Sequence, residues 1–139
     1  MNQRLHTRVA VVSQTEIGHY GLCGVIDGAS DLECSGLEDF PIRALATRLE
    51  RIDVVVVMMA PDALEEMVRE IHVLYPDMPV VGVVDALTIQ QEDIVRLLHT
   101  GLAGLTASLS SGTIVCMVRL AAQHAGVIDM SLVHTMTKP

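Results

Sequence analysis

Six histidines and three cysteines are the side chains in this 139-residue chain best suited to metal binding or nucleophilic chemistry. No two histidines lie at ligand spacing on one predicted element, and Cys23, Cys34 and Cys116 form no Cys-x-x-Cys or Cys/His motif. The chain also lacks the Gly-x-Ser-x-Gly, P-loop and dinucleotide-binding glycine motifs. We therefore predict no metal site, no cofactor and no enzymatic activity, and we interpret the cysteines as reduced thiols that fill small spaces in the core.

Three short apolar segments, residues 8–12, 53–59 and 79–84, have the consecutive β-branched side chains typical of parallel strands that are buried on both faces. Shorter strands are predicted over 32–36 and 104–107. Amphipathic or apolar periodicity predicts helices between these strands, over 16–27, 41–51, 61–75, 91–100 and 112–125. Five strand-helix repeats indicate an open α/β sandwich, whose working site lies outside the carboxyl ends of the strands. The residues at those ends are 13–16, 58–60, 84–87 and 107–109.

Glycine recurs at every third position of the helix predicted over 16–27, at Gly18, Gly21 and Gly24. Each glycine costs about 1 kcal/mol relative to alanine in a helix interior. Close approach of this helix to the sheet or to a neighbouring helix is the ordinary explanation. A flexible or subunit-facing helix is the alternative.

Composition limits the partners that this chain can bind directly. The net charge is -8, with 17 acidic and 9 basic residues, and the aromatic residues are one Phe and two Tyr, so phosphate-neutralising charge and stacking platforms are scarce. The longest apolar segment, 54–60, is far shorter than the roughly 20 residues of a membrane helix, and the polar N-terminus does not resemble a signal peptide. We expect one cytoplasmic domain with no direct contact to membrane or nucleic acid.

The order of several segments is similar to that in receiver domains of two-component response regulators, especially those that precede a LuxR-type helix-turn-helix. This resemblance covers nearly the whole chain. It implies a flavodoxin/CheY-like (βα)5 three-layer sandwich with a parallel five-stranded sheet in the order 2-1-3-4-5. It also implies a receiver-like domain over 1–126, with 127–139 as the start of a linker or a C-terminal tail. The similar segments are 11–14, 21–22, 31–36, 53–58, 75–81, 101–108 and 126–129.

Every position that carries chemistry in receiver domains is altered here. The resemblance places the family's acidic magnesium-binding pair on Ser13 and Gln14, its phosphoacceptor aspartate on Met58, its switch hydroxyl on Val84 and its lysine on Ser108. A thioether cannot accept a phosphoryl group, and a serine-glutamine pair provides no anionic site for a hard cation. The resemblance therefore implies a pseudo-receiver that is not phosphorylated at Met58.

Two carboxylates are expected at the rim of this altered pocket, since Glu16 closely follows the first predicted strand and Asp85 the fourth. Phosphorylation relocated to one of them is an alternative. Neither comes with a metal-binding pair or a lysine, so a solvated strand-end carboxylate is the simpler interpretation.

The last predicted helix carries more apolar residues than its core-facing stripe needs, which suggests a self-association surface. Receiver-like proteins commonly dimerise through this helix, the preceding helix and the strand between them, so the resemblance implies a homodimer. The glycine-containing first helix is the competing surface. The candidate dimer residues are Val95, Leu98, Val115, Cys116, Arg119 and Leu120.

These observations predict a phosphorylation-independent regulatory and dimerisation domain of a transcriptional regulator, which reaches DNA only through an attached or partner helix-turn-helix domain. Two alternatives stay open. The altered, mostly neutral pocket could bind a small-molecule effector. The chain could also act as a stand-alone protein-interaction adaptor.

Overall fold

Alternation along the central strands decides which face of the sheet each side chain occupies. The computed structural model describes residues 6–34, 52–107, 110–123 and 127–128. In β1 (Thr7–Ser13), Ala10 and Val12 join one buried cluster and Val9 and Val11 join the other, because successive residues of a strand point to opposite faces. The valines of β3 (Val54–Met58) and β4 (Val80–Val83) divide in the same way. Both faces are therefore buried, as the consecutive apolar residues predict.

All strands of the sheet are parallel, in the order β2-β1-β3-β4-β5-β6. The predicted five-stranded order 2-1-3-4-5 is confirmed, with β2 (Leu32–Cys34) at one end and β5 (Gly104–Thr106) near the other. The sequence analysis did not predict β6 (Val127–Ile128), which pairs with the outer edge of β5. A strand of two residues is too short to produce a recognisable alternation.

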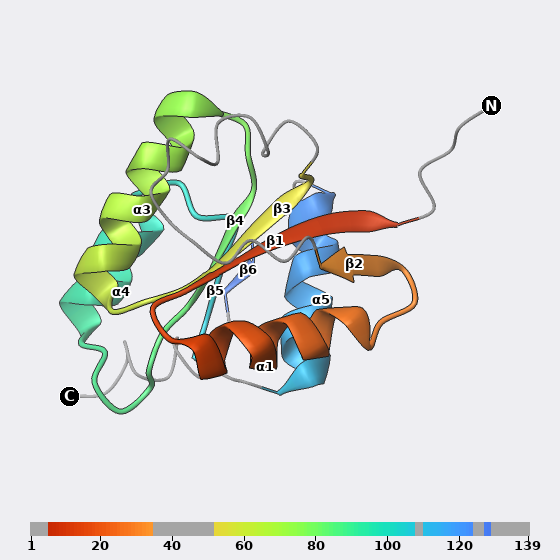
Figure 1. Ribbon diagram of the computed structural model, residues 1–139. Coiled ribbons are helices and arrows are strands. Elements are labelled where there is room, and N and C mark those ends of the chain that lie inside the picture. The colour runs from red at the N-terminus through yellow and green to blue at the C-terminus, as the bar shows by residue number, and fades with distance from the viewer. Residues whose placement is uncertain (1–5, 35–51, 108–109, 124–126, 129–139) are drawn as a thin grey trace.

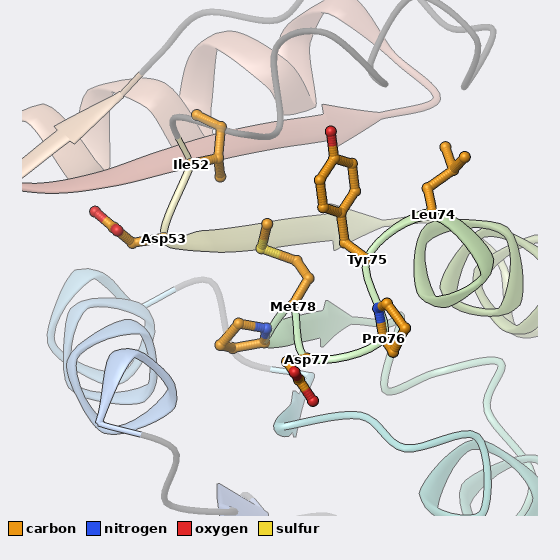
Figure 2. Close-up of a pocket in the computed structure, with 8 residues that line it drawn as sticks. Ile52, Asp53, Leu74, Tyr75, Pro76, Asp77 and Met78 are labelled. Atoms are coloured by element: carbon orange, nitrogen blue, oxygen red, sulfur yellow. The ribbon is translucent and has the colours of Figure 1, made fainter.

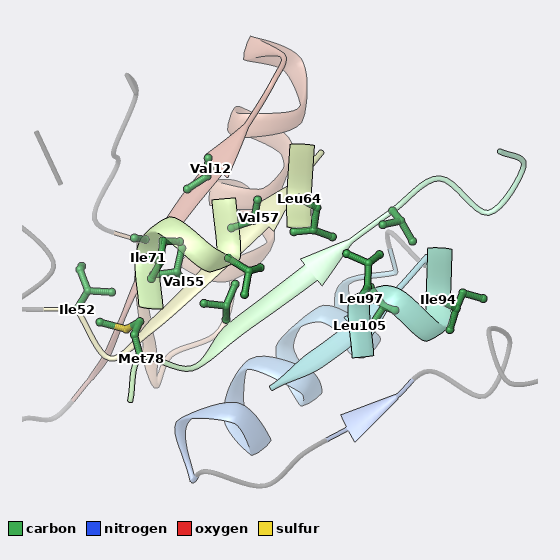
Figure 3. Packing of buried hydrophobic residues seen from close by; sticks show 14 of the residues in the cluster. Val12, Ile52, Val55, Val57, Leu64, Ile71, Met78, Ile94, Leu97 and Leu105 are labelled. Atoms are coloured by element: carbon green, nitrogen blue, oxygen red, sulfur yellow. The ribbon is translucent and has the colours of Figure 1, made fainter. Parts of the chain in front are cut away.

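Two layers of helices cover the sheet (Figure 1). α1 (Glu16–Asp27) and α5 (Ser111–Ala122) pack on the face that carries Val9 and Val11. α3 (Pro61–Leu74) and α4 (Gln91–Leu98) pack on the opposite face, where their buried residues interlock with those of the strands (Figure 3). This is the predicted three-layer sandwich. The helix predicted over 41–51 lies outside the described residues. Among the described helices, none is long and apolar enough to cross a membrane.

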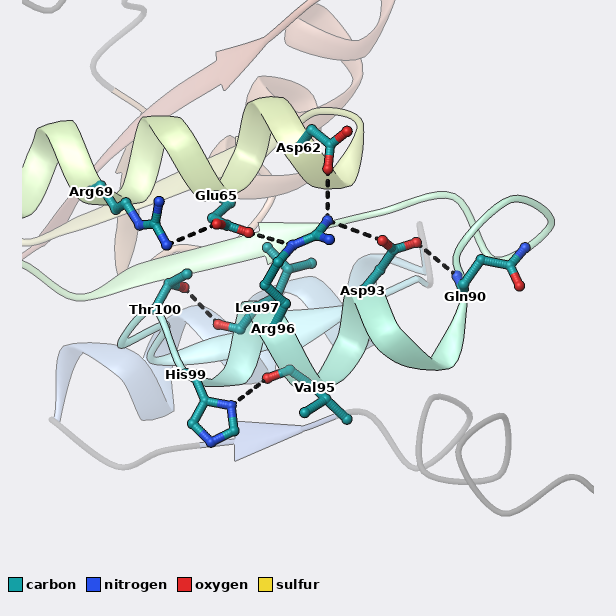
Figure 4. Close-up of polar contacts among 10 residues, drawn as sticks. All are labelled: Asp62, Glu65, Arg69, Gln90, Asp93, Val95, Arg96, Leu97, His99 and Thr100. Atoms are coloured by element: carbon teal, nitrogen blue, oxygen red, sulfur yellow. Dashed lines mark hydrogen bonds and ion pairs between the residues drawn. The ribbon is translucent and has the colours of Figure 1, made fainter.

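Arg96 joins the two helices of the α3/α4 layer (Figure 4). From α4, its guanidinium pairs with Glu65 and with Asp62 of α3, the latter at 2.7 Å, and with Asp93 of its own helix at 3.0 Å. Asp93 also accepts a hydrogen bond from the backbone N–H of Gln90 and so caps the start of α4. One arginine thus links α4 to α3 above the buried residues that the two helices share.

The three glycines of α1 have different surroundings. A Cβ at Gly18 would lie 2.5 Å from Ser13 Oγ and still closer to the terminal methyl of Met58, so the predicted close approach of helix to sheet is confirmed there. A Cβ at Gly21 or Gly24 would meet nothing within 4 Å. Of these three positions, only at Gly18 would a Cβ meet close neighbours, and these are side-chain atoms of Met58, Ser13 and Thr15.

Candidate functional site

A cavity of about 570 Å³ opens at the carboxyl ends of β1, β3 and β4, the edge at which the sequence analysis placed the working site. Five of the predicted pocket and rim residues line it together: Ser13, Gln14, Met58, Val84 and Asp85. Glu16 begins α1 as an exposed residue and is absent from the described lining. Ser108 lies outside the described residues. The other lining residues are Thr15, Met59, Ala60, Pro61, Val83, Ala86, Thr88 and Ala107.

Strand register brings Ser13 and Met58 side by side at the base of the cavity. Ser13 ends β1 opposite Met58, which ends β3 and is in turn opposite Val83 of β4. The Met58 side chain extends to Gly18 of α1, where the missing Cβ leaves room for its methyl group. The thioether therefore occupies space between the sheet and the first turn of α1.

Gln14 connects the two strand ends across the cavity. Its backbone N–H donates to the Met58 carbonyl at 3.4 Å, and its side-chain Oε1 accepts from the N–H of Ala60 at 3.2 Å. The amide thus orders the turn that follows β3. It acts here as a neutral hydrogen-bonding group at the position where the resemblance expects a carboxylate.

The hydroxyl groups beside Gln14 are used in the start of α1. Thr15 Oγ1 caps the helix by accepting from the N–H of Gly18 at 3.0 Å. Ser13 Oγ accepts from the N–H of Thr15 at 3.2 Å. The connection from β1 to α1 is therefore held by local side-chain to backbone hydrogen bonds.

Asp85 directs its carboxylate toward its own loop. Its Oδ1 accepts from the N–H of Leu87 at 2.9 Å, and its carbonyl accepts from the N–H of Ile89 at 3.1 Å. This turn brings Thr88 to the cavity wall, a residue that the sequence analysis missed. The aspartate that starts a turn after a strand was the available signal.

Charge is sparse around the cavity. Asp85 is the only ionisable side chain among the described lining residues, and no group of three metal-ligating side chains occurs in the described part of the chain. The one lysine of the sequence is Lys138, which lies outside the described residues. These walls match an uncharged ligand better than a phosphoryl group, which needs nearby cations to offset its charge.

A second cavity of about 510 Å³ lies at the opposite edge of the sheet, beside the amino ends of β3 and β4 (Figure 2). None of the predicted pocket residues lines it. One wall is the turn from Tyr75 to Pro79, and another is Asp53, whose Oδ2 accepts from the N–H of Arg8 at 2.8 Å. Asp53 thus serves to join β1 to the start of β3.

The structure divides the six candidate dimer residues. Val95 and Leu98 are 39% and 41% exposed on the flank of α4 that faces away from Arg96 and α3. Cys116 is exposed and Leu120 half-buried on α5. Arg119, however, pairs with Asp31 beside β2, and half-buried Val115 lies one helical turn before it, on the same flank. The edge between α4 and α5 is formed by β6 rather than by β5.

The cysteines are less uniform than the sequence analysis predicted. Cys116 is exposed, so its assignment to the core is wrong, because the apolar stripe of α5 wraps past the side that packs on the sheet. Cys23 and Cys34 are half-buried and pack against the cluster beneath α1 and α5. They lie on two different elements, eleven residues apart along the chain, and meet in the fold.

No protein-family model and no curated protein matches the sequence. Solved structures match its fold. A LuxR-family two-component response regulator from Aurantimonas has a TM-score of 0.76 at 13% identity, with 94% of this chain and 95% of that chain covered. The fold is that of a CheY-like receiver domain.

Two further structures span a similar part of the chain. A LuxR-family DNA-binding response regulator from Silicibacter pomeroyi has a TM-score of 0.69 at 19% identity, covering 88% of this chain and 96% of that chain. A protein described as related to pilus assembly, from Burkholderia pseudomallei, has a TM-score of 0.70 at 14% identity and covers 90% and 96%. Identities this low show the receiver fold alone.

Proposed function

We propose that this chain is an atypical receiver domain that regulates through protein contact and homodimerisation, without phosphoryl transfer at the usual strand end. One observation carries the proposal. The cavity opens at the strand ends to which the resemblance assigns the family's phosphorylation pocket, but Ser13, Gln14 and Met58 supply an alcohol, an amide and a thioether there. None of these groups can serve as an acyl-phosphate acceptor or as an anionic ligand for magnesium.

The surroundings of Asp85 argue against relocated phosphorylation. No arginine or lysine is among the described lining residues to pair with a phosphoryl oxygen. Glu16 lies outside the described lining. A carboxylate that has neither a metal-binding acidic pair nor a basic side chain beside it lacks the electrostatic support that phosphoryl transfer requires.

Incubation with acetyl phosphate and magnesium tests the proposal. We expect no phosphoryl adduct in the intact mass, whereas a receiver domain with its acidic pocket intact gains one in the same tube. An adduct that Asp85→Asn or Glu16→Gln removes would overturn the proposal. Asparagine is the suitable replacement at 85 because its side-chain oxygen can still accept from the N–H of Leu87.

We also propose a cytoplasmic location and a role in transcription, through an attached or partner helix-turn-helix domain. The support is the similarity of fold to response regulators, one of which is described as DNA-binding. An antibody to this domain would measure the mass of the native protein in its source cells. A species much heavier than the 15.0 kDa of these 139 residues would support an attached domain. A species of about 15.0 kDa would direct the search to a partner protein.

Effector binding in the cavity is a second candidate function. Its volume of about 570 Å³ falls within the range of roughly 300–1,000 Å³ typical of small-molecule sites. Its walls are mainly apolar, and Gln14, Thr15 and Thr88 supply a few hydrogen-bonding groups. Thermal-shift measurements with uncharged metabolites would detect such binding.

A stand-alone adaptor is the third candidate. The structural similarity to a protein described as related to pilus assembly indicates that this fold is used outside transcription factors. Recovery of the chain at its own length in a stable complex with a different protein would favour this function.

A further inference from the structure

Two cysteines from different elements meet between α1 and the edge of the sheet. Cys23 lies on α1 and Cys34 ends β2, eleven residues later, and their Sγ atoms are 2.6 Å apart. A disulfide needs a separation of about 2.0 Å, so a small shift joins the two atoms. Both side chains are half-buried, which leaves them within reach of a small solute. We propose that Cys23 and Cys34 form a reversible disulfide, a redox modification site that is independent of the proposed regulatory function.

His19 places a ring nitrogen beside Cys23. It lies one helical turn earlier on α1, is buried, and places Nε2 3.6 Å from Cys23 Sγ. The nucleophile in thiol-disulfide exchange is the thiolate, so a ring nitrogen that receives the thiol proton promotes the reaction. Cys116 is exposed on α5 and is not part of this pair.

The backbone around Cys34 is held in place for this contact. The N–H of Cys34 donates to Asp27 Oδ1, at the end of α1, at 3.0 Å. Cys34 also pairs with Val9 in the register of β1 and β2. The thiols are therefore brought together by the packing of α1 on the sheet and not by a short loop between them.

The reaction balances with a low-molecular-weight disulfide, R–S–S–R, as the oxidant. The Cys23 thiolate attacks one sulfur of R–S–S–R, which forms a Cys23–S–S–R mixed disulfide and releases R–S⁻, which takes up a proton. The Cys34 thiolate then attacks Cys23 Sγ, and the second R–S⁻ leaves and is protonated. Two protein thiols are oxidised, one external disulfide is reduced to two thiols, and the two thiol protons end on the released R–SH molecules.

The disulfide would tie α1 to β2, which lies at the end of the strand order. A cross-link that closes a loop of about a dozen residues lowers the unfolding equilibrium constant about a hundredfold in the chain-entropy model. Folding and disulfide formation are thermodynamically linked, so folding should raise the equilibrium constant for forming the disulfide by the same factor.

The experiment equilibrates the full chain in buffers of reduced and oxidised glutathione, natively and in urea, and then alkylates the free thiols for intact-mass and peptide analysis. We expect the native chain to lose two of its three alkylatable thiols, those of Cys23 and Cys34. The ratio of oxidised to reduced glutathione at which this happens should be about a hundredfold lower for the native chain than for the unfolded chain. The proposal would be overturned if the native chain needed a buffer as oxidising as, or more oxidising than, the one that oxidises the unfolded chain. Loss of the Cys116 thiol in place of the pair would also overturn it.

Three variants separate the parts of the proposal. Cys116→Ser should leave the redox behaviour unchanged. In the Cys116→Ser background, Cys34→Ser should trap a single glutathione on Cys23, and a chain that stays unmodified there would contradict the order of attack. His19→Gln should slow formation of that adduct in the Cys34→Ser background, and an unchanged rate would exclude His19 as the proton acceptor.

Discussion

The terminal methyl of Met58 occupies the space beside the backbone of Gly18, where a Cβ would stand. This contact joins the end of β3 to the first turn of α1 and closes the inner wall of the larger cavity. The altered residue at the phosphoacceptor position and the unusual glycine in the helix are therefore parts of one packing arrangement.

Gly18→Ala should destabilise the fold, because the new Cβ forces Met58, Ser13 and Thr15 to move. We expect a loss of about 1–2 kcal/mol in the free energy of unfolding, measured by urea denaturation. Gly21→Ala is the matched control. Its Cβ meets nothing within 4 Å, so the better helix propensity of alanine should stabilise the chain by about 0.5–1 kcal/mol. Equal effects of the two substitutions would contradict this account.

The ion pair between Arg119 and Asp31 should make stability depend on acid pH. Arg119 Nε and Nη2 donate to the two carboxylate oxygens of Asp31 at 2.8 and 2.7 Å, and these bonds lower the pKa of Asp31 below its ordinary value of 3.8. The same contact raises the pKa of Arg119. Because the folded-state pKa is depressed, the stabilisation is fully present above the ordinary carboxylate value and is lost as pH falls through the folded value.

Asp31→Asn should therefore lower the urea midpoint slightly at neutral pH, and its difference from the wild type should vanish in strong acid. The effect is small because both side chains are about half exposed and solvent screens the pair. Arg119→Gln should give the same loss and the same pH dependence. A difference that persists unchanged at low pH would exclude this ion pair as its source.

Leu98→Asp should weaken the proposed homodimer about tenfold or more, because it puts an unpaired charge into an apolar contact. Sedimentation velocity over a range of concentrations measures this change. Val73→Asp is a matched control, since Val73 is 81% exposed on α3, outside the proposed surface. Ile17, 87% exposed on α1, tests the competing surface. A dimer broken by Ile17→Asp and not by Leu98→Asp would assign association to α1.

Met58→Asp should strongly weaken the binding of uncharged ligands in the larger cavity, because a carboxylate there keeps water that an apolar ligand must displace. Thermal shifts with a panel of uncharged aromatic and aliphatic fragments test this, and we expect affinities at least about tenfold lower. Leu74→Asp changes the second cavity and should leave binding unaffected. Binding that survives Met58→Asp would place the ligand elsewhere.

Local patterns were sufficient to predict the layers of the fold. Consecutive valines in β3 require burial on both faces, and the predicted bounds of α1 agree with the structure because Thr15 is placed to cap it. The strand ends that could form a site followed from the same patterns, since carboxyl ends of parallel strands meet at one edge. Thr88 was missed because a turn, and not a strand, brings it to that edge.

The sequence by itself determined most of the buried positions and the approximate bounds of most described elements, because burial on a strand or helix repeats at a fixed short period. Only the tertiary structure decided which distant side chains meet. The contact of Cys23 with Cys34, the pairing of Arg119 with Asp31 and the addition of β6 to β5 all depend on how the layers pack. No local period encodes such contacts, because residues many positions apart become neighbours only when the sheet and its helices assemble.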